Sequence, residues 1–284
     1  MQILIASNNT PHSNKAFEFG LIVAKQAKAD LTLVRVIARP GERKLARQQL
    51  QDQRRVAEAA GFETQCFLQI GKPAEQILHT AHEEEVDLIV LGEGSKETLR
   101  RRAVGPTNER VIANATRPIL LVKENSHEAK RFLFLHSGQQ GLATMRRFLR
   151  YAGELLRRKT EVTVLHVMSQ IGASYRISDW QLLAEAEEMI KQKTLEGEWL
   201  AGTLAAVKKA RKVKAVPKVR HGLVVDEILN EANNGDYDII VLGNHRRGGW
   251  QEILVDDIAK HVISSVPQSV LVVHGGLELS EPSG

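Results

Sequence analysis

The chain has few of the residues that supply covalent or redox chemistry. Cys66 is the only cysteine among 284 residues, which excludes an intramolecular disulfide and a thiolate metal cluster. No Gly-x-Ser-x-Gly elbow, complete Walker A loop or His-Glu-x-x-His stretch occurs, and no pair of carboxylates has a spacing suited to hydrolysis. The sequence therefore favours a protein that binds and regulates over an enzyme.

Long hydrophobic runs are also missing. No uninterrupted apolar stretch approaches the roughly 20 residues that a membrane-spanning helix needs. Residues 1–6 (MQILIA) read as a first strand, without the basic region of a signal peptide. Together with the lone cysteine, these features lead us to expect a cytoplasmic protein in a reducing compartment.

Charge of one sign is not concentrated along the sequence. The chain has 39 Lys and Arg against 34 Asp and Glu, a net charge of +5. Basic and acidic residues alternate in the expected helices, as in residues 42–44 (ERK), which is typical of solvated helix faces. Nucleic-acid binding requires basic residues gathered on one face. We therefore expect no nucleic-acid partner.

Two copies of one unit make up the chain. Residues 86–92 (VDLIVLG) reappear as residues 237–243 (YDIIVLG), a shift of about 151 residues that also carries Gly71 onto Gly222. Upstream the shift is smaller, because a longer middle segment in the second copy takes up the difference. The repeat predicts two domains, residues 1–124 and residues 130–276.

Each copy alternates strands with helices. In the first copy, short apolar runs predict strands at residues 3–6, 31–37, 63–69, 88–91 and 119–122, with helices between them. This alternation predicts an α/β fold of two tandem, doubly wound, mostly parallel five-stranded sheets. In such sheets ligands bind beyond the carboxyl ends of the strands. That edge contains residues 7–10 and 92–105.

The opening strand and Ser-started helix at residues 3–13, the VDLIVLG strand and the closing PILLV strand resemble the universal stress protein family. The resemblance covers nearly the whole chain. It implies Rossmann-like domains of the adenine-nucleotide alpha hydrolase type. It also implies an intramolecular pseudo-dimer, in which the terminal strands 119–122 and 270–273 pair.

ATP-binding members of this family carry a loop of Gly, two residues, Gly, nine residues and then Gly-Ser or Gly-Thr, whose backbone N–H groups can hold phosphate oxygens. Gly92 and Gly105 match the outer glycines, whereas Ser95 replaces the middle glycine and Pro106 the final hydroxyl residue. Asn8 stands where the family has an acidic residue that contacts the nucleoside. A packed but empty loop is the alternative to a working site. The resemblance implies that a nucleotide site would be lined by Ala6, Asn8, Val36, Gly92, Ser95, Gly105, Thr107 and Asn108.

The second copy departs further from this pattern. Asp256 and Asp257 occupy the positions of the final Gly-Ser or Gly-Thr, and Ser137 occupies the acidic position. Two carboxylates at a helix start satisfy the positive end of the helix dipole and would repel a triphosphate. We therefore expect a structural second half that binds no nucleotide.

Three other features have both a functional and a structural interpretation. His79 and His82 lie one helical turn apart without a third ligand, which favours a surface pair over a metal site. Residues 100–102 (RRR) could neutralise a triphosphate or an acidic partner, or simply be hydrated. The apolar stripe of residues 182–190 in the longer segment predicts core packing, with a docking groove as the alternative.

The leading hypothesis is a stress-response regulatory protein with unknown protein partners. It would bind ATP or another adenine nucleotide in the first copy only. One alternative is a regulatory domain that acts with a membrane transporter or antiporter, since related tandem domains accompany such proteins. A weak ATPase is the other alternative, although no general base is visible. We assign no catalytic residue and no metal ligand.

Overall fold

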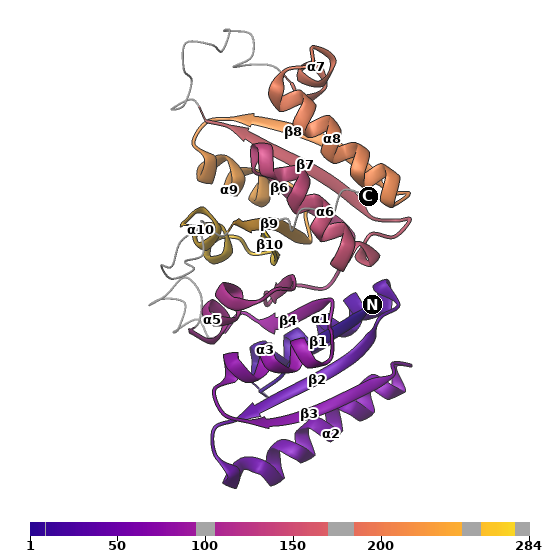
Figure 1. Cartoon of the computed structure of the whole chain (residues 1–284), viewed down its shortest axis with the longest axis vertical. Coiled ribbons are helices and arrows are strands. Elements are labelled where there is room, and N and C mark those ends of the chain that lie inside the picture. The colour runs from indigo at the N-terminus through magenta and orange to yellow at the C-terminus, as the bar shows by residue number, and fades with distance from the viewer. Residues whose placement is uncertain (9, 95–105, 170–184, 246–256, 276–284) are drawn as a thin grey trace, which may run out of the picture.

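The computed structural model describes residues 1–8, 10–94, 106–169, 185–245 and 257–275. Within these ranges ten strands form one sheet in the order β3-β2-β1-β4-β5-β10-β9-β6-β7-β8, with helices on both faces (Figure 1). No helix in the same ranges combines the length and the apolar character needed to cross a membrane.

In the first half, the strands lie within about one residue of their predicted positions, and all but the edge strand β3 are largely buried apolar runs. They are β1 (Gln2–Ala6), β2 (Asp30–Ile37), β3 (Thr64–Ile70), β4 (Leu88–Gly92) and β5 (Ile119–Val122). The helices are α1 (Pro11–Ala27), α2 (Arg43–Ala59), α3 (Pro73–Glu83) and α5 (Pro106–Asn114). Helix α1 begins two residues before the predicted Ser13, because Thr10 caps it and Pro11 suits its first turn. Helix α2 is preceded by a short 3₁₀ turn, η1 (Pro40–Glu42).

The second half repeats this topology. Its strands are β6 (Arg131–His136), β7 (Glu161–Met168), β8 (Lys214–His221), β9 (Ile239–His245) and β10 (Ser269–Gly275). Its helical segments are η2 (Gly138–Gln140), α6 (Gly141–Ala152), η3 (Gly153–Leu155), α7 (Ala186–Lys191), α8 (Leu195–Ala210), α9 (Val224–Asn234) and α10 (Asp257–Ser265). The strand orders β3-β2-β1-β4-β5 and β8-β7-β6-β9-β10 correspond element by element. The predicted fold class, with tandem α/β halves, is therefore confirmed.

The two halves join through β5 and β10. These strands pair antiparallel, with Leu120 opposite Leu271, whereas all the other neighbouring strands of the described sheet pair parallel. They are the two terminal strands named in the implied pseudo-dimer. Their pairing merges two five-stranded sheets into one.

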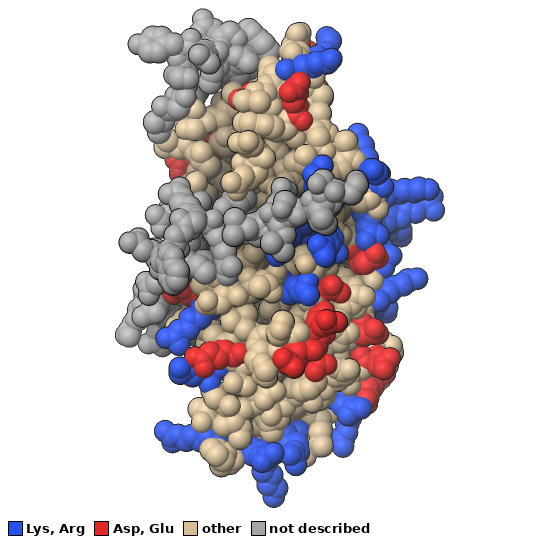
Figure 2. Space-filling view, viewed as in Figure 1, with Lys and Arg blue, Asp and Glu red and all other residues tan. Residues whose placement is uncertain are grey.

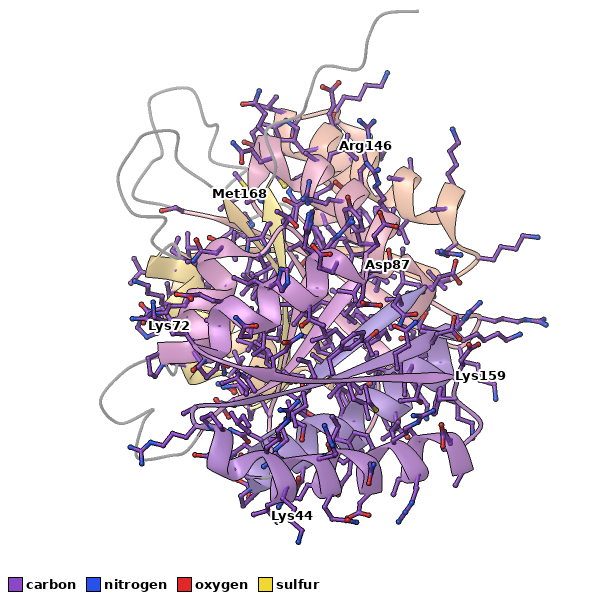
Figure 3. The ribbon with its side chains drawn as sticks, turned by 60° about the horizontal axis from the view of Figure 1, so that its bottom comes forward. Lys44, Lys72, Asp87, Arg146, Lys159 and Met168 are labelled. Carbon is purple, nitrogen blue, oxygen red and sulfur yellow. The ribbon has the colours of Figure 1, made fainter. Side chains whose placement is uncertain are left out.

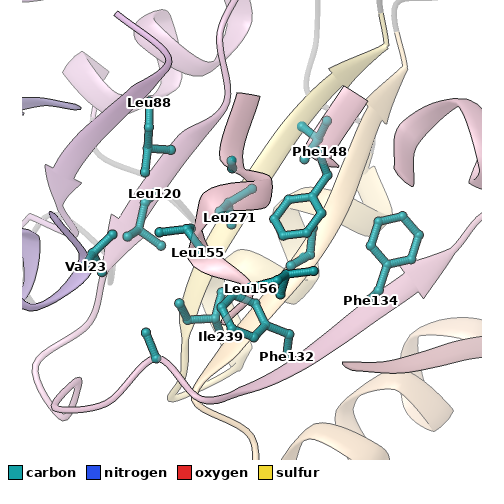
Figure 4. Close-up of a cluster of buried hydrophobic side chains, with 14 of the residues drawn as sticks. Val23, Leu88, Leu120, Phe132, Phe134, Phe148, Leu155, Leu156, Ile239 and Leu271 are labelled. Atoms are coloured by element: carbon teal, nitrogen blue, oxygen red, sulfur yellow. The ribbon is translucent and has the colours of Figure 1, made fainter. Parts of the chain in front are cut away.

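Two apolar layers cover the sheet. One lies between the sheet and α1, α2, α6 and α8, and the other lies between the sheet and α3, α5, α9 and α10. The first layer crosses from one half to the other without a break, because Leu120 of β5 and Leu271 of β10 belong to the same cluster as Phe148 of α6 (Figure 4). Burial of this continuous apolar surface favours association of the halves.

Reciprocal contacts reinforce the seam between β5 and β10. Lys123, just after β5, donates from Nζ to the backbone oxygen of Ile263 at the end of α10, at 2.7 Å, and it also forms an ion pair with Glu93. His274, in β10, donates from Nε2 to the backbone oxygen of Ile112 near the end of α5. Each half therefore caps the last turn of a helix that belongs to the other half.

Replacing Lys123 by methionine should lower the free energy of unfolding by about 3–5 kcal/mol, because the Glu93 carboxylate then loses its cation in a poorly solvated place. The side chain of Lys123 is 5% exposed and that of Glu93 18%. The measurement is the urea unfolding midpoint of the full chain.

Lys130→Met is the matched control, since Lys130 pairs with Glu128 at side-chain exposures of 51% and 40%. This exposed pair should contribute about 1 kcal/mol or less. Equal shifts for the two variants would contradict a special role for Lys123 at the seam.

Candidate functional site

A pocket of about 290 Å³ opens at the carboxyl ends of β1, β2 and β4, the edge at which the parallel sheet predicts a ligand. One wall is apolar and comes from the strands and α3: Ala6, Val34, Val36, Pro73, Ile77 and Leu91. Hydroxyl, amide and imidazole groups from the loop after β1 and the start of α5 provide the rim: Ser7, Asn8, Thr10, His12, Ser13, Thr107 and Asn108. Gly92, Gly94 and Pro106 complete the lining.

Six of the eight residues predicted for a nucleotide site line this single pocket. They are Ala6, Asn8, Val36, Gly92, Thr107 and Asn108. Ser95 and Gly105, together with the arginines at 100–102, lie outside the described residues. The sequence did not identify the contribution of α3, because nothing in residues 73–77 indicates which face of the sheet this helix covers.

The loop after β1 is shaped by a chain of hydrogen bonds that ends on Asn8. The backbone N–H of Ser13 donates to Thr10 Oγ1 at 3.4 Å, and Thr10 Oγ1 in turn donates to Asn8 Oδ1 at 2.7 Å. The backbone N–H of Thr10 also donates to Asn8 Oδ1, at 3.2 Å. Because both groups from Thr10 donate, the carbonyl oxygen of Asn8 faces the turn. The Asn8 side chain can therefore donate a hydrogen bond to a ligand through its amide N–H group, whereas a carboxylate at this position would present a second acceptor oxygen.

Buried hydroxyl groups connect the same loop to two helices. Ser13 Oγ donates to Ser7 Oγ at 3.1 Å, Gln53 Nε2 of α2 donates to Ser7 Oγ at 2.7 Å, and the backbone N–H of Asn8 donates to Ser13 Oγ at 2.8 Å. Ser7 and Ser13 are both buried. The polar rim is therefore held in place before any ligand arrives.

The end of β4 approaches the start of α1 so closely that residue 92 must be glycine. A Cβ at Gly92 would lie 2.4 Å from the backbone oxygen of His12. Asn108 Nδ2 donates to the backbone oxygen of Gly92 at 2.8 Å. Asn108 was expected to line the nucleotide site. This hydrogen bond shows that its side-chain amide also fixes the turn after β4. Gly94 has a φ of 85°, a left-handed backbone conformation that glycine adopts readily. In the sequence it directly precedes Ser95, which replaces the family's middle glycine.

The described lining of the pocket carries no formal charge, because it contains no Asp, Glu, Lys or Arg. An apolar wall with a few convergent polar groups is the usual form of a small-molecule site. Such a lining suits a flat, uncharged ring system on the wall and hydrogen-bonding groups at the rim.

At the equivalent edge of the second half, histidines replace this serine network. His136, at the end of β6, hydrogen-bonds through Nε2 to Thr203 Oγ1 of α8 at 3.0 Å. The His166 ring lies edge-on to His136, with centroids 5.7 Å apart, and to Trp199 at 6.3 Å. A Cβ at Gly141 would lie 2.3 Å from the His136 ring. These contacts are those of a tightly packed interior.

The remaining sequence features have structural roles in the described residues. His79 lies 4.0 Å from Glu83 on the exposed face of α3, and no cluster of three metal-ligating side chains occurs in the residues described. In the longer segment, Met189 of α7 is buried in the core, while residues 182–183 lie outside the described ranges. Asp87 accepts a hydrogen bond from the backbone N–H of Gln2 at 2.9 Å, which ties β4 to the start of β1 (Figure 3 shows its position).

Comparisons with known proteins agree with this architecture. A model described as the universal stress protein family matches residues 1–123 and 140–274. A universal stress protein of Methanocaldococcus jannaschii is 30% identical over 81 residues, 28% of this chain, so the match spans 50% of that relative's length. A second from the same organism is 27% identical over 143 residues, 45% of this chain and 84% of the relative.

Among solved structures, a universal stress protein from Archaeoglobus fulgidus matches with a TM-score of 0.71 at 17% identity, covering 97% of this chain and 98% of that one. A Pseudomonas aeruginosa protein, described as functionally unknown, matches with a TM-score of 0.70 at 16% identity, covering 96% and 92%. At these identities the two structures support the fold alone.

The histidine pair of the second half predicts a pH-dependent stability. Burial, and to a lesser extent repulsion from His166, lowers the pKa of His136 from 6.5 to about 4. The unfolded chain, with a pKa near 6.5, therefore binds a proton that the folded chain does not. The stability due to the neutral ring is fully present above about pH 6.5 and is lost as the pH falls toward about 4, on the order of 3 kcal/mol in total.

Urea midpoints measured from about pH 7 to about pH 4.5 test this expectation. His136→Gln keeps a hydrogen-bonding group near Thr203 but cannot titrate, so its stability should fall less steeply with acid. Parallel profiles for the two proteins would show that His136 does not cause the loss.

Proposed function

This chain belongs to the universal stress protein family, and we propose that it is a regulatory binding protein that takes an adenine nucleotide such as ATP in its first half. The observation that carries the proposal is the convergence of six predicted residues on one pocket at the carboxyl ends of β1, β2 and β4. The pocket volume, about 290 Å³, is near the lower end of the range for small-molecule sites.

In this proposal, the base of the nucleotide lies against the apolar wall formed by Val34, Val36 and Ile77. Asn8 and Thr107 supply hydrogen-bonding groups to the sugar or base. The phosphates extend toward the segment after Gly92 and the start of α5, where backbone N–H groups favour anions. Pro106 is the first residue of α5 and has no N–H, which removes one of these donors.

We propose binding in place of catalysis: the described lining offers no carboxylate or lysine, and its one candidate general base is the imidazole of His12. The signal would then pass to protein partners, in the cytoplasm. Two alternatives, a role with a membrane transporter and a weak ATPase activity, are distinguished from this proposal by experiment. Co-purification with native membranes would indicate the former. Steady phosphate release that disappears in Gly92 variants would indicate the latter.

Val36→Phe fills the pocket and should weaken equilibrium binding of ATP by at least about tenfold, equivalent to about 1.4 kcal/mol. Isothermal titration of the full chain measures the affinity. The matched control is Val167→Phe, because Val167 occupies the corresponding position of β7 in the second half. The control should bind ATP like the unmodified chain. Equal loss in both variants, or no loss in either, would refute the assignment of the pocket.

A second pair of variants separates the shape of the loop from ligand contact. Asn8→Ala removes both the acceptor for Thr10 and the amide donor, so it should weaken binding. Asn8→Asp keeps the acceptor for Thr10 but replaces the donor by a negative charge. If the amide donates to the ligand, Asn8→Asp should also weaken binding, while the thermal midpoint stays close to that of the unmodified chain. Unchanged affinity in Asn8→Asp would exclude a role for this donor.

A further inference from the structure

Three guanidinium groups surround the ring of Tyr151, at the end of α6. The Cζ atoms of Arg117, Arg150 and Arg147 lie 4.6, 5.2 and 5.5 Å from the ring centroid. Arg117 precedes β5 in the first half, whereas the other three residues belong to α6 in the second half. The cluster is therefore assembled from both halves and lies on elements that do not line the nucleotide pocket.

The arginines around Tyr151 are not paired with carboxylates in the part of the chain that the structure describes. Among the ion pairs that the described residues form, none includes Arg117, Arg147 or Arg150, although arginines elsewhere, such as Arg131 and Arg220, are paired. Helix α6 carries three arginines and no Asp or Glu. Cation–π contacts with one ring offset part of the repulsion among the three cations, at about 0.5–1 kcal/mol each on an exposed surface.

The cluster is held in position and accessible. Arg147 Nη2 donates to the backbone oxygen of Thr116 at 2.8 Å, which fixes this side chain across the two halves. Arg150 is exposed, and Tyr151 is half-buried. Arg146, also on α6, is exposed beside them (Figure 3). Blue side chains gather along the right-hand side of Figure 2, at the level of α6 and α8.

We propose that this arginine–tyrosine surface, formed by Arg117, Arg146, Arg147, Arg150 and Tyr151, binds the phosphodiester backbone of single-stranded nucleic acid. Guanidinium groups bind phosphate through paired N–H donors, which a lysine cannot match. Tyrosine rings and guanidinium planes are also the groups on which unpaired bases stack. The alternating charges of the sequence predicted no nucleic-acid partner, because they do not show that Arg117 lies beside α6 in the fold.

The test is fluorescence anisotropy of the full chain with a fluorescein-labelled deoxythymidine oligomer of about 12 nucleotides. Contacts from Arg117, Arg146 and Arg150 to three phosphates predict a slope of log K against log salt of about −2, while Arg147 is held by the backbone of Thr116. The double variant Arg117→Gln/Arg150→Gln should bind at least about tenfold more weakly, with a slope of about −0.7. The single variant Arg150→Gln changes an exposed side chain and should weaken binding in the same direction but less than the double variant. Because this position is exposed, its effect on binding is not a consequence of misfolding.

The matched control is Arg54→Gln/Arg55→Gln, which removes two exposed, ion-paired arginines from α2. This control should bind the oligomer like the unmodified chain. Tyr151→Leu should weaken binding more than Tyr151→Phe does, since only leucine removes the ring. The proposal is overturned if no binding occurs at about 50 mM salt. Equal losses in the control and the Arg117/Arg150 variant would also overturn it. Equally tight binding of an oligoglutamate of the same length would overturn the proposal as well, because it would indicate an acidic protein partner instead.

Discussion

The antiparallel pairing of β5 with β10 determines the arrangement of the whole molecule. A five-stranded parallel sheet leaves its last strand with an unpaired edge, and an exposed edge is a template for association. Here the two halves cover each other's edge, and the apolar layer beneath α1, α2, α6 and α8 continues through the junction. The helix caps made by Lys123 and His274 add polar contacts in the same place. With the seam formed inside one chain, this pairing does not depend on protein concentration.

The shared topology has allowed the interiors of the two halves to diverge. Ser7 and Gln53 form a hydroxyl–amide network beside the first loop, whereas His136 and Thr203 occupy the comparable place between β6 and α8. The first network leaves the loop after β1 at the rim of a pocket, whereas in the second half the His166 ring packs edge-on against both His136 and Trp199. Backbone topology therefore conserves the same sheet edge in both halves, while the described side chains at that edge differ between them.

The sequence predicted the inner strands well because they are short, buried apolar runs between turn residues, as residues 88–92 illustrate. The parallel order also placed Asn8 and Gly92 near one another, because parallel strands bring their carboxyl ends to the same edge, and the family resemblance added Thr107. The sequence could not show that the Asn8 carbonyl turns toward Thr10, since that orientation follows from the cap of α1. Nor could it bring Arg117 to Tyr151, because a contact between distant segments depends on helix packing across the seam.

The seam is symmetric in geometry but not in charge. His274 occupies the position of Lys123, and Asn244 that of Glu93, so a histidine and an amide stand where the other side has an ion pair. Asn244 is buried, and neither of its amide atoms has a hydrogen-bond partner among the described residues.

The charged side of the seam adjoins the half that keeps the pocket. Glu93 directly follows Gly92, and its backbone N–H donates to the oxygen of Val122 at 3.1 Å. The turn after β4 is thus held from one side by Asn108 and from the other by Lys123 through Glu93. A site whose turn is fixed before binding loses less conformational entropy when a ligand enters. The ion pair at the seam therefore helps to fix the turn beside the pocket of the first half.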